Sequence, residues 1–239
     1  MQVNSQSTMS FKEKLDNFWY YHKWHTVIAL FVILAIVICS FQMCSKESYD
    51  IYIMYAGGHE FKRSSANGDV PEYVKAVSSL KQVCSDFDGD GTVSVSFINL
   101  YVPSSDEIAD AEKNPDKELN YTLIAQDKER LDSNILYSDY YVCIITQDVY
   151  NQYKTVQELE MFAPLSQYAD KSSELVFYTD SAVYLSSTKL ASLPVFSKLP
   201  EDTLICLRTK SAIASHFSKE QTEEQYRRSV EVIKNILSK

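Results

Sequence analysis

An uncharged apolar run near the amino terminus constrains this chain more than any other feature. Residues 26–43 read TVIALFVILAIVICSFQM and contain no charged side chain. As an α-helix with a rise of about 1.5 Å per residue, such a run spans roughly 27 Å, close to the hydrocarbon thickness of a bilayer. A helix also satisfies its backbone donors and acceptors internally, as lipid requires. Residues 26–44 are therefore predicted to form a transmembrane helix, with residues 26–43 in contact with the lipid bilayer.

The residues before this run suit a membrane interface. Phe11, Leu15 and Phe18 recur at helical spacing with charged residues between them, which predicts a short interfacial helix leading into the span. Residues 1–25 are therefore predicted to be a cytoplasmic and interfacial segment. The following amphipathic aromatic side chains favour the headgroup region: Phe18, Trp19, Tyr20, Tyr21 and Trp24.

The charges that flank the span predict its direction. Lys12, Lys14 and Lys23 precede it, whereas Lys46 is the nearby basic residue that follows. The positive-inside rule then keeps the amino terminus in the cytoplasm and places residues 45–239 outside it. A cleaved signal peptide is the alternative, but its apolar core is usually about 7–15 residues long and ends at small residues. The longer run and its Ser-Phe-Gln-Met end favour an uncleaved, single-pass anchor in the cell membrane.

The remainder of the chain has the composition of a folded acidic domain. Hydrophobic residues make up 45% of the sequence and charged residues 23%, both ordinary for a globular protein. The formal net charge is -9. An acidic surface repels phosphate groups, so nucleic acid is excluded as an expected partner.

Cysteine spacing predicts neither a metal site nor a disulfide framework. Cys84, Cys143 and Cys206 are scattered through the domain without a metal-binding pattern. Buried free thiols are the default for such positions. A Cys143–Cys206 bridge is the alternative if the two strands that carry them are neighbours.

Strands and helices alternate in the first half of this domain. Residues 49–56, 93–102 and 139–146 are predicted strands, with predicted helices over 71–84 and 119–131 between them. Such alternation indicates a parallel sheet with crossover helices. The fold class predicted for residues 45–239 is therefore α/β, with a mixed, largely parallel sheet.

Weaker patterns complete this prediction. Residues 103–116 are expected to form a polar loop, and the last helix is expected to begin at a capping box of Thr222 and Gln225. Short helices are predicted over residues 148–153 and 156–162, and strands over 175–178, 182–185 and 203–208.

Several segments carry a resemblance to a known class of protein. They are DIYIMYAGG at 50–58, DYYVCIITQDVYNQY at 139–153, LPEDTLICLRTK at 199–210 and, before the span, FKEKLDNFWYYHKWH at 11–25. Together the chain resembles membrane-anchored extracytoplasmic proteins of Gram-positive bacteria that carry a solute-binding-protein-like lobe. The resemblance implies one binding lobe outside the membrane rather than a two-lobed clamshell, and a shared fold does not by itself supply a function.

Motifs for common catalytic chemistry are missing from the sequence. The five glycines form neither a dinucleotide-binding nor a P-loop pattern. His59-Glu60 begins like a zinc-protease motif, but Arg63 stands where the second histidine belongs. The leading hypothesis is therefore a non-enzymatic binding or assembly module. A carboxylate-dependent hydrolase and a structural subunit of a membrane complex are the alternatives.

One candidate ligand site lies where predicted parallel strands end. Ligands of open parallel sheets bind beyond the carboxyl ends of the strands. The predicted site therefore consists of Gly57, Gly58, His59, Thr146 and Gln147. Its expected ligand is a small molecule, a sugar or a peptide, and ordinary connecting loops are the alternative.

A second candidate site is the aspartate-rich segment DFDGDGT at 86–92. Aspartates at positions 1, 3 and 5 and glycine at position 6 repeat the first half of a Ca²⁺ loop, but Phe97 replaces the glutamate of position 12. The segment is therefore predicted to be a weak Ca²⁺ site, with a plain turn as the alternative. Its expected ligands are Asp86, Asp88, Asp90 and the backbone carbonyl of Thr92.

Overall fold

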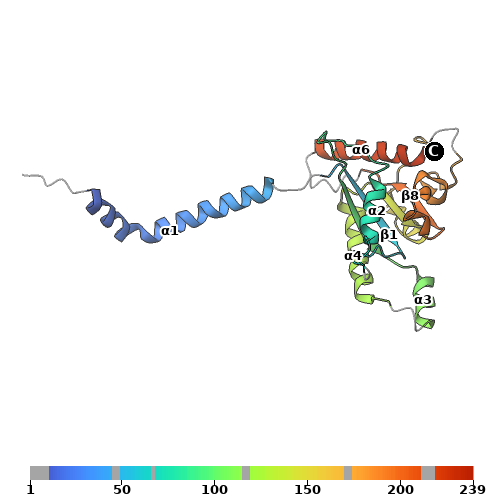
Figure 1. The fold of residues 1–239 in the computed structure, drawn as a ribbon, viewed down its shortest axis with the longest axis horizontal. Helices are drawn as coiled ribbons and strands as arrows, with labels where there is room; N and C mark the ends of the chain where they lie inside the picture. Colours follow the sequence, from blue (N-terminus) through green and yellow to red (C-terminus); the bar gives the residue numbers. More distant parts are fainter. Residues whose placement is uncertain are drawn as a thin grey trace, which may run out of the picture. The chain divides into compact units, whose positions relative to one another are not determined.

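The chain divides into two compact units, Met1–Ser48 and Tyr49–Lys239. The computed structural model describes residues 11–44, 49–65, 68–114, 119–169, 174–210 and 219–238. In the first unit, α1 (Phe11–Cys44) is one uninterrupted helix that joins the predicted interfacial segment to the predicted span (Figure 1). Residues 45–48, which follow the predicted span, lie outside the described residues.

Helix α1 contains the candidate membrane span found among the described residues. Its stretch Phe18–Ser40 is long and apolar enough to cross a bilayer. The aromatic side chains at its amino-terminal end are exposed; Trp19 and Trp24, for example, are 54% and 69% exposed. By length and composition this helix suits a membrane anchor, and a signal sequence would meet the same criteria.

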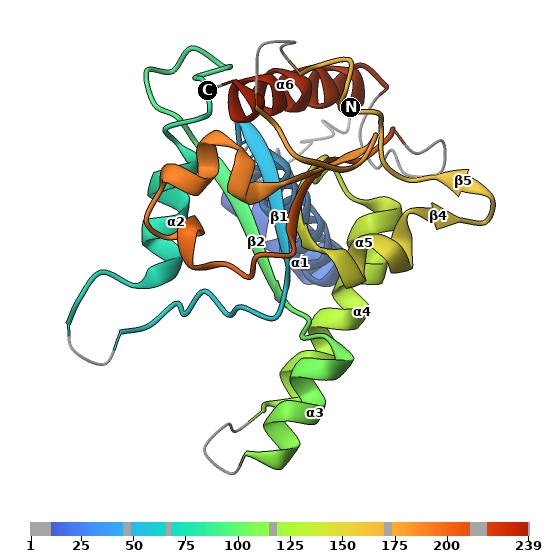
Figure 2. The same cartoon turned by 90° about the vertical axis from the view of Figure 1, so that its right-hand side faces the viewer.

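The second unit is built on a six-stranded mixed sheet with the order β2-β1-β3-β8-β7-β6 (Figures 1 and 2). Strand β1 pairs in parallel with β2 and with β3, whereas β8 is antiparallel to both β3 and β7, and β6 is antiparallel to β7. The strands of this sheet are β1 (Ile51–Gly57), β2 (Val95–Tyr101), β3 (Val142–Thr146), β6 (Phe177–Thr179), β7 (Ala182–Tyr184) and β8 (Thr203–Leu207).

Helices cover both faces of this sheet. The α-helices are α2 (Glu72–Leu80), α3 (Ser105–Lys113), α4 (Tyr121–Tyr137), α5 (Gln147–Tyr153) and α6 (Lys219–Leu237). Three 3-10 turns, η1 (Leu185–Ser187), η2 (Lys189–Ser192) and η3 (Phe196–Lys198), lie between β7 and β8. One core joins α2 and α6 to the sheet through residues such as Leu80 and Ile233. The other joins α4 and α5 through residues such as Leu131 and Val149.

The mixed α/β sheet predicted from the sequence is confirmed. Strand β3 is buried along its whole length, as its continuous apolar run predicts. Parallel pairing, which was predicted for most of the sheet, is found only among β2, β1 and β3. Strand β8 pairs with β3 in the antiparallel direction, and the pairs β8–β7 and β7–β6 are antiparallel as well. The solute-binding-like lobe is not confirmed by this topology.

The polar loop predicted over residues 103–116 is wrong, because it contains α3. Its first turn is closed by a capping box: the Ser104 hydroxyl accepts a hydrogen bond from the Glu107 N–H at 3.1 Å, and the Glu107 carboxylate accepts one from the Ser104 N–H at 2.7 Å. This Ser-x-x-Glu pattern was readable in the sequence. The helix was not predicted because it has few apolar residues and buries only Ala111, so it shows no helical apolar pattern.

The short helix predicted over residues 156–162 is also wrong. The chain there forms a hairpin of β4 (Thr155–Val156) and β5 (Leu159–Glu160). Gln157 and Glu158 connect its strands with φ of 51° and 66°. Positive φ at both central residues is typical of a tight hairpin turn, which usually carries Asn-Gly or Asp-Gly. Gln-Glu gives no such signal.

The structure also tests the predicted cap at Thr222 and the alternative of a Cys143–Cys206 bridge. Helix α6 already includes Lys219, so Thr222 lies inside the helix and is not its cap. Cys143 and Cys206 occupy directly opposite positions on β3 and β8, yet both are free and fully buried. The strands are thus neighbours without a disulfide between them.

Candidate functional site

The carboxyl ends of β1, β2 and β3 meet at one edge of the sheet. The register pairs Gly57 with Tyr101 on one side of β1 and Ala56 with Ile145 on the other. A Cβ atom on Gly57 would lie 2.8 Å from Cγ2 of Thr146, so these two residues are in close contact. The structure therefore brings the ends of β1 and β3 together, and a ligand role for them stays a prediction.

This edge contains the topological switch point of the sheet. From β1 the chain reaches β2 through α2 on one face, and from β2 it reaches β3, on the other side of β1, through α3 and α4. Since α2 and α4 pack on opposite faces, the connections diverge between β1 and β3. Open α/β sheets bind their ligands at such a divergence, beyond the carboxyl ends of the strands.

Gly58 lies beneath the first turn of α3. A Cβ atom at Gly58 would overlap the carboxylate of Glu107, which is the capping-box residue of that helix. The missing side chain thus lets α3 approach the end of β1 closely. Glu107 consequently adds a negative charge at the carboxyl edge.

His59 and Gln147 have partners away from α3. The His59 N–H donates to the Tyr55 hydroxyl at 3.1 Å, and its Nε2 lies 3.3 Å from a carboxylate oxygen of Glu72 on α2, without hydrogen-bond geometry. The Gln147 backbone N–H donates to the Asp202 carbonyl at 3.1 Å, and its side chain donates to the Tyr184 hydroxyl at 2.9 Å.

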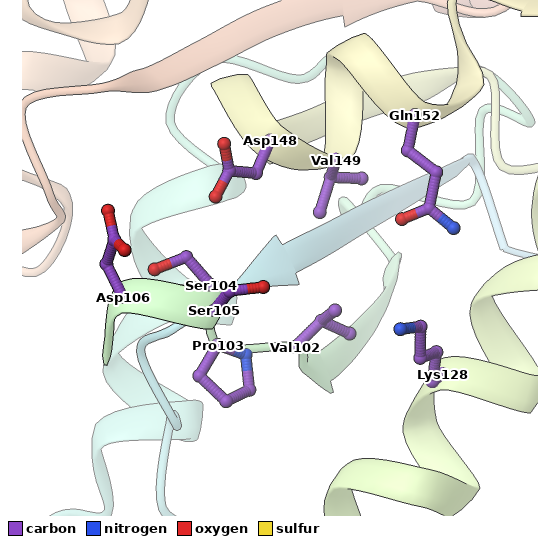
Figure 3. Close-up of a pocket in the computed structure, with 9 residues that line it drawn as sticks. All are labelled: Val102, Pro103, Ser104, Ser105, Asp106, Lys128, Asp148, Val149 and Gln152. Atoms are coloured by element: carbon purple, nitrogen blue, oxygen red, sulfur yellow. The ribbon is translucent and has the colours of Figure 1, made fainter. Parts of the chain in front are cut away.

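A cavity of about 390 Å³ opens beside these residues, between the first turn of α3, the middle of α4 and α5 (Figure 3). Its lining differs from the five residues predicted for the ligand site. No sequence signal joins the lining residues, because they come from separate elements; Asp148 directly follows Gln147 of the predicted set. The cavity is lined by Val102, Pro103, Ser104, Ser105, Asp106, Lys128, Asp148, Val149 and Gln152.

Two part-buried hydrogen bonds hold the walls of this cavity in place. Asp127, which is 3% exposed, accepts a hydrogen bond from the Tyr101 backbone N–H at 2.9 Å and fixes α4 beside the end of β2. The Tyr153 hydroxyl donates to the Asp132 carboxylate and ties α5 to α4. Lys128 follows Asp127 directly, so its position at the cavity depends on these contacts.

Opposite charges occupy opposite sides of the cavity. Asp106 and Asp148 lie on one side, Lys128 and Gln152 on the other, with Val102 and Val149 between them (Figure 3). Within the described part of the chain, Lys128 has no hydrogen bond or ion pair. The cavity therefore presents an acidic end, an apolar middle and a cationic end.

Negative charge is crowded next to the acidic end. Burial raises the pKa of Asp202, and the nearby charges of Glu107 and Asp148 raise it further. Burial likewise raises the pKa of Tyr101, with contributions from Glu107 and Glu60. A cation bound nearby would offset the negative charges that raise the pKa of Asp202.

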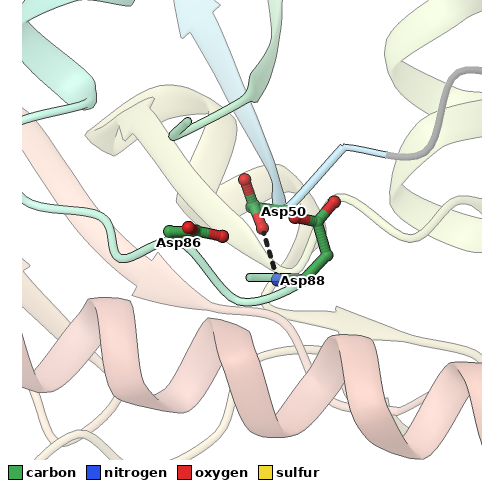
Figure 4. A group of neighbouring side chains, drawn as sticks. All are labelled: Asp50, Asp86 and Asp88. Atoms are coloured by element: carbon green, nitrogen blue, oxygen red, sulfur yellow. Dashed lines mark hydrogen bonds between the residues drawn. The ribbon is translucent and has the colours of Figure 1, made fainter. Parts of the chain in front are cut away.

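The opposite, amino edge of the sheet carries a different acidic cluster. Asp50, which is fully buried just before β1, accepts hydrogen bonds from the backbone N–H groups of Phe87 (2.8 Å), Asp88 (3.1 Å) and Ser94 (2.8 Å), and from the Ser94 hydroxyl at 2.9 Å. Figure 4 shows the bond from the Asp88 N–H. Burial acts to raise the pKa of Asp50, but these hydrogen bonds outweigh it and lower the pKa.

The predicted Ca²⁺ loop folds around this residue. Asp50, Asp86 and Asp88 bring one carboxylate oxygen each within 4.8 Å of one another, whereas Asp90 is not part of this group. Asp90 instead accepts hydrogen bonds from the N–H and the hydroxyl of Thr92, both at 2.7 Å. Sequence analysis did not include Asp50 in the predicted site, because Asp50 is far in sequence from the loop 86–92. Ca²⁺ binding by the loop stays a prediction.

No protein-family model, curated protein or solved structure matches this chain. The resemblance to solute-binding lobes therefore rests on the sequence segments alone. A function has to be argued from the geometry of the site itself.

Proposed function

We propose that this chain is a membrane-tethered, extracytoplasmic binding module that holds a small ligand at the carboxyl edge of β1, β2 and β3. The observation that carries the proposal is the cavity of about 390 Å³ at the switch point of the sheet. Small-molecule sites are typically concave, about 300–1,000 Å³ in volume, and occur at such switch points.

The lining of the cavity also supports a binding role. Polar side chains converge on it from α3, α4 and α5, while the buried Val102 and Val149 supply an apolar floor. A few polar groups placed around apolar surface are what orients a ligand. The residues predicted from the sequence, Gly57, Gly58 and Thr146 in particular, adjoin this cavity at the strand ends and let its walls approach.

The anchor supports the location. Helix α1 contains one stretch, Phe18–Ser40, that is long and apolar enough to cross a membrane. Lys12, Lys14 and Lys23 precede the apolar run, which favours a cytoplasmic amino terminus. The domain Tyr49–Lys239 would then face the exterior, where it can meet solutes before they reach the membrane.

Occluding the cavity tests the binding proposal. Ser105 lines the cavity and is exposed, so Ser105→Trp should fill the cavity with little effect on folding. The full chain in lipid nanodiscs would be screened by ligand-observed NMR against amino acids, dipeptides, monosaccharides and carboxylic acids. We expect bound compounds to be lost in Ser105→Trp and kept in Lys113→Trp, a matched change at the exposed end of α3. Binding that survives Ser105→Trp, or no binding at all, would contradict the proposal.

Chemical labelling tests the orientation. Lys113 is exposed, so Lys113→Cys should react with a membrane-impermeant maleimide in intact cells. The unsubstituted chain gives the background from its own cysteines. Labelling of Lys113→Cys only after lysis would place the domain in the cytoplasm.

A carboxylate-dependent hydrolase is the second candidate, and the pair Asp148 and Asp202 favours it. Glycoside hydrolysis uses two neighbouring carboxyl groups, one of which has a raised pKa and acts as the acid. Burial raises the pKa of Asp202, and the charge of Asp148 adds to that shift. Release of nitrophenol from nitrophenyl glycosides by the full chain, abolished in Asp202→Asn, would support this candidate. Equal release by both proteins, or none, leaves the binding role as the better proposal.

A further inference from the structure

We infer that the ligand of the carboxyl-edge cavity is a zwitterion whose amino group and carboxylate are separated by a short apolar stretch, as in a dipeptide or an ω-amino acid. This inference rests on the proposed binding function and names the chemistry of its ligand. It follows from the order of groups across the cavity: acidic, apolar, cationic (Figure 3).

The acidic end suits an ammonium group. Asp106 and Asp148 line the cavity, and the charges of Glu107 and Asp148 add to the burial that raises the pKa of Asp202. A cation placed here removes like-charge repulsion that the protein alone leaves in place. The same crowding disfavours phosphate and other dianions, because their charge would add to the repulsion.

The cationic end suits a carboxylate. Lys128 extends from α4 into the cavity (Figure 3) and has no hydrogen bond or ion pair among the described residues. It belongs to a helix turn that the buried Asp127 fixes to the end of β2. Gln152, which lies on the same side, adds an amide donor. A carboxylate that accepts from both would form charge-assisted hydrogen bonds, which are stronger than neutral ones.

The middle of the cavity suits a short aliphatic segment. Val102 and Val149 are 9% and 3% exposed and lie between the two charged ends. Without aromatic side chains among its lining residues, the cavity offers no stacking surface for a sugar ring. Of the ligands considered from the sequence, the peptide class is therefore favoured over the sugar class.

A matched ligand set tests the inference on the full chain in nanodiscs. The probes are dialanine and 5-aminovalerate, with N-acetyl-dialanine lacking the amine and dialanine amide lacking the carboxylate. We expect each blocked form to bind about tenfold more weakly than dialanine, because one charge-assisted contact is lost. The relative affinities of dialanine and 5-aminovalerate distinguish a peptide from an ω-amino acid.

Two variants test which end of the cavity binds the carboxylate and which end binds the amino group. Lys128→Met should weaken dialanine about tenfold and leave dialanine amide unchanged, since the amide has no carboxylate to lose. Asp148→Asn should weaken dialanine and its amide alike and leave N-acetyl-dialanine unchanged. Lys113→Met and Asp69→Asn are matched changes at exposed positions outside the lining, and they should bind as the unsubstituted chain does.

Failure of the inference and failure of the proposed function give different results. If blocked and free forms bind equally, or if Lys128→Met weakens every probe equally, the zwitterion inference is overturned. The binding function then stands as long as Ser105→Trp abolishes whatever binds. If no compound of the probe set or of the wider panel binds the unsubstituted chain, both are overturned. Unchanged melting temperatures of the variants show that any loss of affinity is not a loss of folding.

Discussion

The two edges of the central sheet both carry clustered carboxylates, but the protein treats their charge in opposite ways. At the amino edge, Asp50 is fully buried, accepts hydrogen bonds at both oxygens, and has a lowered pKa. At the carboxyl edge, Asp202 has a raised pKa beside Glu107 and Asp148.

Backbone N–H donors act to lower the pKa of both carboxyl groups. They prevail over burial at Asp50, whereas burial and the charges of Glu107 and Asp148 prevail over them at Asp202. Backbone N–H groups aimed at Asp50 stabilise its charge and so stabilise the fold. Glu107 and Asp148 instead place negative charge close to Asp202, beside a cavity. The amino edge is thus suited to holding the structure together, and the carboxyl edge to binding a cation from outside.

The largest effect expected is at the amino edge. Asp50→Ala removes the acceptor that the N–H groups of Phe87, Asp88 and Ser94 share. We expect a loss of about 2–4 kcal/mol in the free energy of unfolding. Thermal unfolding of the full chain in detergent measures it, as a fall in melting temperature of roughly 5–15 °C. Asp69→Ala at an exposed position is the control, and an equal effect of both would remove the contrast between the edges.

Calcium gives the next largest effect if the aspartate loop binds it. Asp86 and Asp88 have oxygens within 4.8 Å of an oxygen of Asp50, and a cation there would offset their repulsion. With a Kd near 10⁻⁴–10⁻³ M, 1 mM Ca²⁺ should stabilise the protein by about 0.4–1.4 kcal/mol. Melting curves in Ca²⁺ and in chelator measure the difference, which Asp88→Ala should abolish. Identical curves for the unsubstituted chain would make the loop a plain turn.

A smaller loss of stability is expected at the carboxyl edge when Gly58 is replaced. In Gly58→Ala the new Cβ displaces the carboxylate of Glu107, which is the flexible end of an exposed side chain. The capping box of α3 then loses one of its two hydrogen bonds, a cost of about 0.5–1 kcal/mol. Chemical denaturation compares Gly58→Ala with Glu107→Ala, which loses the same bond. If Gly58→Ala lowers the free energy of unfolding as much as Asp50→Ala does, the two edges contribute equally to stability and the contrast fails.

The smallest expected effect concerns pH: the contributions of Asp202 and Asp50 to stability should change in opposite directions as pH falls. Because the pKa of Asp202 is raised by folding, its ionised form opposes folding, and this penalty is relieved as pH falls through the folded pKa. Asp202→Asn should therefore be neutral or stabilising at pH 7, by less than about 0.5 kcal/mol.

Asp50 should respond in the opposite direction. Its lowered pKa contributes stability that is present above the unfolded pKa and is lost as pH falls through the folded one. The destabilisation caused by Asp50→Asn should thus shrink below about pH 4. Melting temperatures of both variants between pH 7 and pH 3 test the comparison, and slopes of the same sign would contradict it.

Local patterns in the sequence determined the elements that bury a regular face. The uncharged run of residues 26–43 forms part of α1, and alternating or continuous apolar residues predicted β1, β2 and β3 correctly. Helix α2 follows its apolar spacing in the same way. The strand and α2 predictions succeed because the core selects apolar side chains at the period of the backbone.

Only the tertiary structure decided which of these elements meet. Nothing local states that β8 lies antiparallel beside β3, that Asp50 accepts hydrogen bonds from a loop before β2, or that Lys128 faces Asp148 across a cavity. The position after a strand did predict that Gly57 and Thr146 would be close, because parallel strands share an edge. The side chains that line the cavity come from three helices and from the segment between β2 and α3, and long-range packing and hydrogen bonding position all four. Periodicity in the sequence records that a face is buried, whereas the neighbour it is buried against is selected by the fold as a whole.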